Sequence, residues 1–104
     1  MYMIALVLSG QKNEYDALFN AMKALGPWSN RLGDAWIVQS KHPARRIRDL
    51  LKPHLKPNDR LFVSQMTRNW AGTGMGAQFP EWIGRRAFEI TEVDGQVTST
   101  VLKG

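Results

Sequence analysis

The first 67 residues alternate between short apolar runs and segments whose apolar residues recur every three or four positions. Short apolar runs are typical of buried strands, and the wider spacing is typical of helices with one buried face. The order strand, helix, strand, strand, helix, strand predicts an α+β sandwich, with one four-stranded antiparallel sheet and both helices on one face. The expected strands are 2–8, 28–32, 35–39 and 60–66, and the expected helices lie within 13–25 and 40–55.

The first helix has a start signal and a stop signal. Asn13 is expected to be its N-cap, with Asp16 three residues later in the reciprocal position. Gly26 and Pro27 end the pattern. One face is expected to pack into the core, since its apolar residues share helical spacing: Tyr15, Leu18, Phe19, Met22 and Leu25.

The second helix follows a predicted hairpin around 33–34, in which Trp36 and Val38 share one face and Ile37 lies on the other. Ser40 is expected to cap the helix, with Pro43 in its first turn. The core-facing residues are expected to be Ala44, Ile47, Leu50, Leu51 and Leu55.

The pattern changes after Thr67. Residues 68–86 are rich in glycine and aromatic side chains with little periodicity, and we expect a long linker there. Two β-prone runs flank Asp94 and Gly95, which predicts a hairpin over 88–101 within a C-terminal β extension, 87–104. The whole chain is expected to be a single domain with a core at 1–67.

Composition limits the possible functions. The 104 residues contain no cysteine, so the chain needs no oxidising compartment, and a cytoplasmic location is expected. The apolar run 2–8 is too short to span a bilayer and is expected to be a strand, so no membrane partner is predicted. A net charge of +5 favours polyanionic partners such as nucleic acid. Two helices on one face leave the other sheet face open, which favours a homodimer.

Five segments together resemble small proteins of the SinR-like or CRISPR-associated-endonuclease-two-like group, distant kin of virulence-associated protein D. The resemblance covers roughly residues 2–75, and it implies a ferredoxin-like fold and a symmetric dimer in which chain beyond the fourth strand reaches the partner's sheet. The segments are the first strand, 22–26, 36–38, 47–55 and 59–63.

The resemblance also raises the question of catalysis. Nucleolytic members of the group carry a metal-binding Asp at the end of the first strand, where this chain has Ser9 or a neighbour. A hydroxyl is a poor substitute for a carboxylate as a Mg²⁺ ligand. Glu14 and Asp16 are the nearest acids and are weak candidates, more simply explained as charges that stabilise a helix N-terminus. We therefore predict no catalytic residue, no metal site and no cofactor, with Mg²⁺ required only if the chain is a nuclease.

Basic residues are the better candidates. The exposed face of the second helix is expected to carry Arg45, Arg46 and Lys52, with Lys56 nearby and Arg68 beyond the fourth strand. Such residues either form a solvated face, on which Arg45 can pair with Asp49, or bind phosphates without reading sequence.

The aromatic residues of the tail have two interpretations. Aromatic rings interleaved with arginine can stack the bases of a single strand, and the same residue types are common at the centre of protein interfaces. We favour the interface, with Trp70, Phe79, Trp82, Phe88 and Ile90 as its residues.

These observations predict a non-catalytic, homodimeric protein associated with double-stranded DNA or RNA. A metal-dependent endonuclease of the same group is one alternative. A toxin-like or regulatory protein that acts through protein contacts alone is another.

Overall fold

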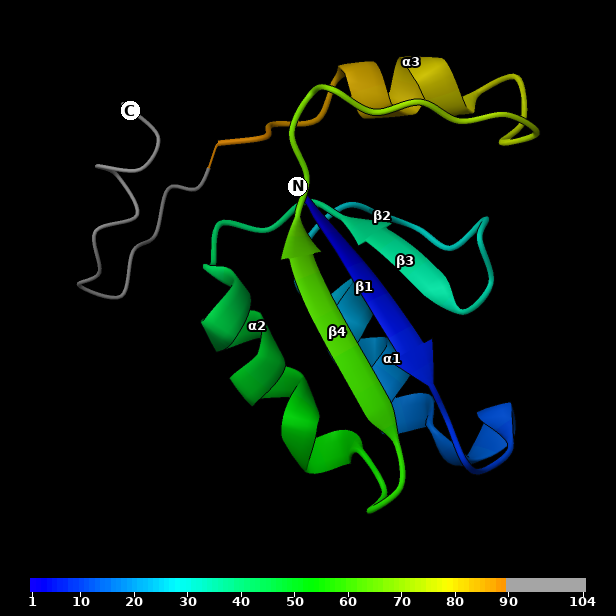
Figure 1. The fold of residues 1–104 in the computed structure, drawn as a ribbon, viewed down its shortest axis with the longest axis vertical. Coiled ribbons are helices and arrows are strands. Elements are labelled where there is room, and N and C mark those ends of the chain that lie inside the picture. The colour runs from blue at the N-terminus through cyan, green and yellow to red at the C-terminus, as the bar shows by residue number, and fades with distance from the viewer. Residues whose placement is uncertain (90–104) are drawn as a thin grey trace.

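The computed structural model describes residues 1–89, in which three α-helices and four strands follow one another along the chain (Figure 1). Two 3₁₀ turns, Lys12–Glu14 and Lys52–His54, precede α1 and follow α2. The elements are β1 (Tyr2–Val7), α1 (Asp16–Lys23), β2 (Trp28–Ser29), β3 (Ala35–Val38), α2 (Ala44–Leu51), β4 (Arg60–Gln65) and α3 (Phe79–Gly84).

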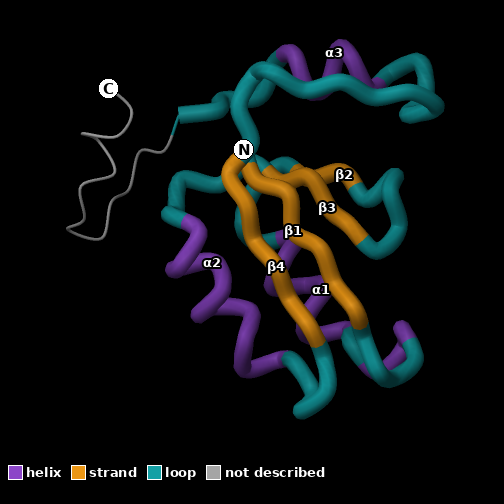
Figure 2. The backbone as a smooth tube through the Cα atoms, in the orientation of Figure 1, coloured by secondary structure: helices purple, strands orange, loops and turns teal. Residues whose placement is uncertain are grey.

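The four strands form one antiparallel sheet in the order β2-β3-β1-β4 (Figure 2). In β1, Ile4 lies opposite Trp36 of β3 and opposite Val63 of β4. Since side chains alternate between the faces of a sheet, this register places the three residues on one face. The predicted α+β class and four-stranded antiparallel sheet are confirmed. The strands β2 and β4 are the two edges.

The helices α1 and α2 cover that face and form the main core with it. Leu18 and Met22 of α1, and Ile47 and Leu51 of α2, are fully buried against β1 and β3. Aromatic stacking adds to this packing, because the rings of Phe19 and Trp36 lie 5.8 Å apart and nearly parallel. The apolar spacing therefore identified the buried face of α1.

The start of α1 differs from the prediction. Asn13 lies within the first 3₁₀ turn, and the helix begins at Asp16 after Tyr15. The capping box of Gln11 and Glu14, in which the Glu14 carboxylate accepts the Gln11 N–H at 2.9 Å, belongs to that 3₁₀ turn. The N-cap of α1 is Tyr15, which makes no side-chain capping hydrogen bond, so the predicted cap at Asn13 and Asp16 is wrong.

The second helix also begins and ends elsewhere. Its N-cap is Pro43, while the Ser40 hydroxyl accepts the His42 N–H at 3.2 Å in the preceding turn. The expected core position of Leu50 is wrong, since that side chain is 40% exposed. Ile47 and Leu51 are one helical turn apart and fill the core side, whereas Leu50 lies about 100° from Leu51 around the helix.

The segment predicted to be a linker contains helix α3. Phe79 and Ile83 of α3 are buried in a second cluster with Met1, Ile37 and Phe88. Ile37 projects from the sheet face opposite α1 and α2, so this cluster covers the end of that face where β1 begins (Figure 1). A six-residue helix offers less than two turns of periodicity, which explains why its apolar pattern did not predict it.

The predicted hairpin at 88–101, apart from Phe88 and Glu89, lies outside the described residues, as does Ile90. None of the helices in residues 1–89 is long and apolar enough to cross a membrane.

Candidate nucleic-acid interface

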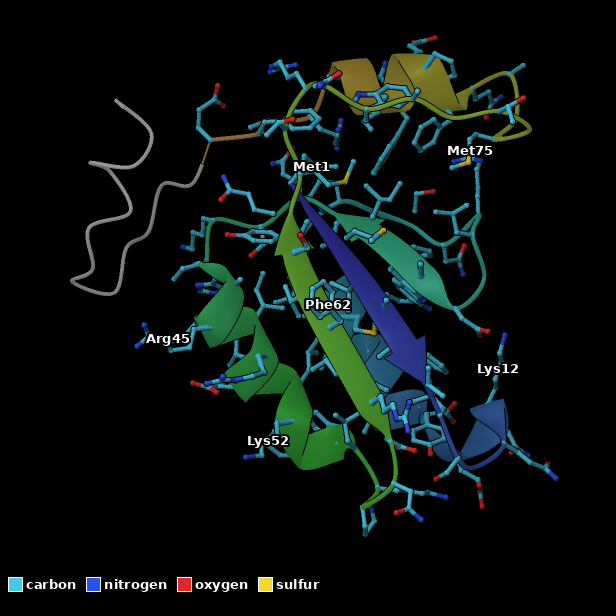
Figure 3. All side chains as sticks on the ribbon, in the orientation of Figure 1. Met1, Lys12, Arg45, Lys52, Phe62 and Met75 are labelled. Carbon is cyan, nitrogen blue, oxygen red and sulfur yellow. The ribbon has the colours of Figure 1, made fainter. Side chains whose placement is uncertain are left out.

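The exposed face of α2 carries most of the predicted phosphate-binding residues. Arg45, Arg48 and Lys52 are spaced at i, i+3 and i+7, so they form one stripe along the helix, and all three are exposed. Figure 3 shows Arg45 and Lys52 pointing outward from the sheet. Arg46 is also exposed, further around the helix. Arg45 and Arg46 thus lie on α2, and Lys52 follows directly as the first residue of the second 3₁₀ turn.

One acidic residue lies within this face. The Asp49 carboxylate accepts a hydrogen bond from Arg48 Nε at 3.0 Å and lies 2.8 Å from its Nη2. Both side chains are more than half exposed, so solvent screens the pair. Residues 44–52 thus contain four basic residues and one acidic residue.

A groove separates this helix from the edge strand β4. Its volume is about 330 Å³, and it is lined by Ala44, Arg45 and Arg48 on the helix side and by Leu61, Phe62 and Val63 on the strand side. Phe62 is 64% exposed, and Figure 3 shows it over β4. Phe62 was not predicted to be exposed, because an apolar triplet is typical of a buried strand. The signal in the sequence was that Phe62 shares a strand face with the polar residues Arg60 and Ser64.

The two remaining basic candidates lie apart from α2. Lys56 Nζ donates to Glu14 Oε1 at 2.8 Å and lies 5.1 Å from the Tyr15 ring centroid. The hydrogen bond with Glu14 raises the pKa of Lys56. Arg68 lies 4.7 Å above the ring of Phe88, near α3. The five predicted phosphate-binding residues therefore lie in three separate parts of the structure: along α2 and directly after it, beside Glu14, and near α3.

The end of β1 is a hydrogen-bonded junction, with Asp59 at its centre. Asp59 Oδ1 accepts the Ser9 N–H at 2.7 Å, the Ser9 hydroxyl at 2.9 Å and the Tyr15 hydroxyl at 3.0 Å. Asp59 Oδ2 accepts the Lys56 N–H at 2.7 Å. The carboxylate thereby joins the loop after β1 to the loop before β4. We call these four residues the Asp59 junction.

The hydrogen bonds hold Asp59 in its charged form. Burial would raise the pKa of Asp59, but the bonds from Ser9, Lys56 and Tyr15 outweigh it and lower the pKa to about 2. Glu14 has a lowered pKa because it accepts hydrogen bonds from the Lys56 side chain and the Gln11 backbone.

The three weak catalytic candidates are not assembled into a catalytic group. Ser9 binds Asp59, Glu14 pairs with Lys56, and Asp16 lies exposed in the first turn of α1. Within residues 1–89, no three His, Asp or Glu side chains are grouped so that they could hold a metal ion. Ser9 also lacks a histidine among its hydrogen-bond partners there, so no base is in place to activate its hydroxyl.

The aromatic residues of the tail pack mostly against each other. Phe79 is 2% exposed, and its ring centroid lies 5.6 Å from that of Trp70 and 5.9 Å from that of Trp82. Phe88 is also buried. Phe79 and Phe88 therefore present little surface to a partner, while Trp70 is 37% exposed. Trp70 also lines an apolar cavity of about 300 Å³ between the sheet and the chain before α3, together with Met3, Leu32 and Met75.

Comparisons with known proteins give no match, either to a protein-family model, to a curated protein or to a solved structure.

The Asp59 junction predicts a pH dependence of stability. A carboxyl group whose pKa is about 2 when folded, against an ordinary value of 3.8, stabilises the fold fully above about pH 4. This contribution is lost as the pH falls toward 2. In Asp59→Asn, an NH₂ group takes the place of the carboxylate oxygen that accepts the Lys56 N–H, and an NH₂ group cannot accept that hydrogen bond. The variant should therefore unfold at lower urea concentration near neutral pH.

The measurement is urea unfolding of both proteins between pH 7 and pH 2. The gap between the two midpoints should be constant above pH 4 and should narrow below it. A gap that does not change with pH would show that the Asp59 charge does not stabilise the fold.

Proposed function

We propose that this chain is a non-catalytic, nucleic-acid-associated protein that acts as a homodimer, similar to the adaptation subunit of CRISPR systems. The observation that carries the proposal is the basic stripe of α2 beside the edge strand β4. Arg45 and Arg48 on α2 and Lys52 directly after it follow one line, and Arg46 is exposed further around the helix.

The fold supports this proposal. The chain order β1-α1-β2-β3-α2-β4, combined with the sheet order β2-β3-β1-β4, suits a ferredoxin-like sandwich. A shared fold leaves the function open, so the assignment to nucleic acid depends on the α2 face.

The α2 face suits phosphates better than bases. Its arginine and lysine side chains project from the exposed side of the helix, and side chains of these types bind phosphate oxygens whatever the base sequence. Interactions of this kind release counterions and bind without sequence preference. We therefore infer weak binding of duplex DNA or RNA that weakens steeply with salt.

A metal-dependent nuclease is the second candidate, and the Asp59 junction is the observation that favours it. It places one carboxylate beside Ser9, at the end of the first strand. Against this candidate, Asp59 Oδ1 already accepts three hydrogen bonds and Oδ2 a fourth. A metal ion would have to displace those donors.

The first prediction of the proposed function concerns the α2 face. Replacing Arg45, Arg46 and Lys52 together with Ala should weaken duplex binding and reduce the salt slope by about one for each phosphate that is no longer neutralised. Fluorescence anisotropy of a labelled duplex at several salt concentrations measures both quantities. The control replaces Lys12, Lys23 and Arg85, which removes the same charge from other surfaces. Equal effects of the two triple variants would show that α2 is not the site and that net charge alone governs binding.

The second prediction concerns the oligomer. Val7 is 61% and Leu32 49% exposed, and the apolar cavity beside Trp70 adds to this uncovered surface, so we expect a dimer at tens of micromolar in sedimentation experiments. A protein truncated after Glu89 keeps the buried Phe88 and loses the predicted hairpin, and it should dissociate or aggregate if that hairpin completes the partner's sheet. A full-length monomer would contradict the proposal.

The third prediction concerns catalysis. The purified protein should cleave neither DNA nor RNA with Mg²⁺ or Mn²⁺, because Asp59 and Glu14 are committed to hydrogen bonds within the chain. Gel assays with single and double strands test this. Cleavage that Asp59→Asn or Glu14→Ala abolishes, while circular dichroism shows a folded variant, would establish the nuclease instead.

A further inference from the structure

Phe62 is the most exposed of the large apolar side chains among the described residues. It projects from β4 on the sheet face opposite α1 and α2, where Ala5 lies directly across on β1 and Ala35 lies beyond it on β3. The methyl side chains of Ala5 and Ala35 are too short to cover the Phe62 ring. The ring therefore keeps a surface on which a planar group can stack.

Basic residues lie on the same sheet face as the ring and in the lining of the groove beside it. Arg60 is exposed two residues earlier on β4, on the same face as Phe62. Arg45 and Arg48 line the groove of about 330 Å³ that Phe62 also lines. A partner that is apolar throughout would remove water from the exposed Arg60 guanidinium on this face, which is costly. A polyanion with planar, apolar bases satisfies both the ring and the charges.

We propose that this groove binds single-stranded nucleic acid, with one base stacked on Phe62 and the adjoining phosphates against Arg45, Arg48 and Arg60. This inference rests on the proposed function and gives it a strand preference. In a duplex the faces of the bases are covered by their neighbours, so Phe62 contributes only to binding of a single strand. Phosphate binding by α2 contributes to both.

Phe62→Ala tests the stacking interaction. Anisotropy with fluorescein-labelled polythymidine and polyuridine strands should show affinity reduced by about 5- to 150-fold, the contribution of one stacked base. Affinity for a labelled duplex should not change. Leu50→Ala is the matched control, because Leu50 is also an exposed apolar side chain, has no ring and does not line the groove. Phe62→Tyr should restore single-strand binding, since it restores an aromatic face.

A cross-linking experiment locates the base directly. Polyuridine that carries 5-iodouridine should, on irradiation, attach to the tryptic peptide 61–68, which trypsin releases by cleaving after Arg60 and after Arg68. Attachment only to peptides that lack Phe62 would overturn the proposal. Because Phe62 is exposed, the alanine variant should fold, and its thermal unfolding should match that of the unmodified protein.

The outcomes separate this inference from the proposed function. If the unmodified protein binds neither single nor double strands, both fail. If it binds both, and Phe62→Ala weakens neither or weakens both equally, the stacking proposal fails and the phosphate-binding function stands. If Phe62→Ala instead turns a dimer into a monomer in sedimentation, Phe62 belongs to a subunit interface and the stacking proposal is wrong.

Discussion

The central position of β1 is the constraint on which the rest of the structure depends. The strand pairs with β3 on one side and β4 on the other, so its residues set the register of both. Its two faces are covered differently. Tyr2, Ile4 and Leu6 are buried beneath α1 and α2, while burial on the opposite face falls from complete at Met1 to slight at Val7. The buried end lies against α3, and the uncovered end is the part of the sheet that is open to a partner or ligand.

Local periodicity predicted the α1 and α2 side of the sheet. Tyr15, Leu18 and Met22 were expected in the core and are buried there, because a helical face without charged residues is stable only when it packs against other apolar residues. The bounds of the helices were less well predicted, because capping depends on which side chain reaches which N–H. Gln11 and Glu14 cap the 3₁₀ turn that contains Asn13, and α1 begins after it without a side-chain cap.

The features that the sequence did not predict depend on interactions between distant residues. Helix α3 is too short to show a period and is fixed by packing against Met1 and Ile37. Aspartate is a common residue in turns, and nothing near Asp59 in the chain indicates that Ser9 is its hydrogen-bond partner. Phe62 lies within an apolar triplet, and only the strand order places it on an edge with no helix above it. The basic residues of α2 were predictable because a helix presents them together whatever the tertiary structure.

The Asp59 junction also has a consequence for the order of folding. Ser9 and Asp59 are separated by 50 positions, and the two segments they join contain the end of β1 and the beginning of β4. Closing so long a loop costs chain entropy before any interaction compensates for it. The hairpin of β2 and β3 closes a far shorter loop. We therefore expect the pairing of β1 with β4 to be the slow event in folding, and the groove beside α2 to exist only in molecules that have completed it.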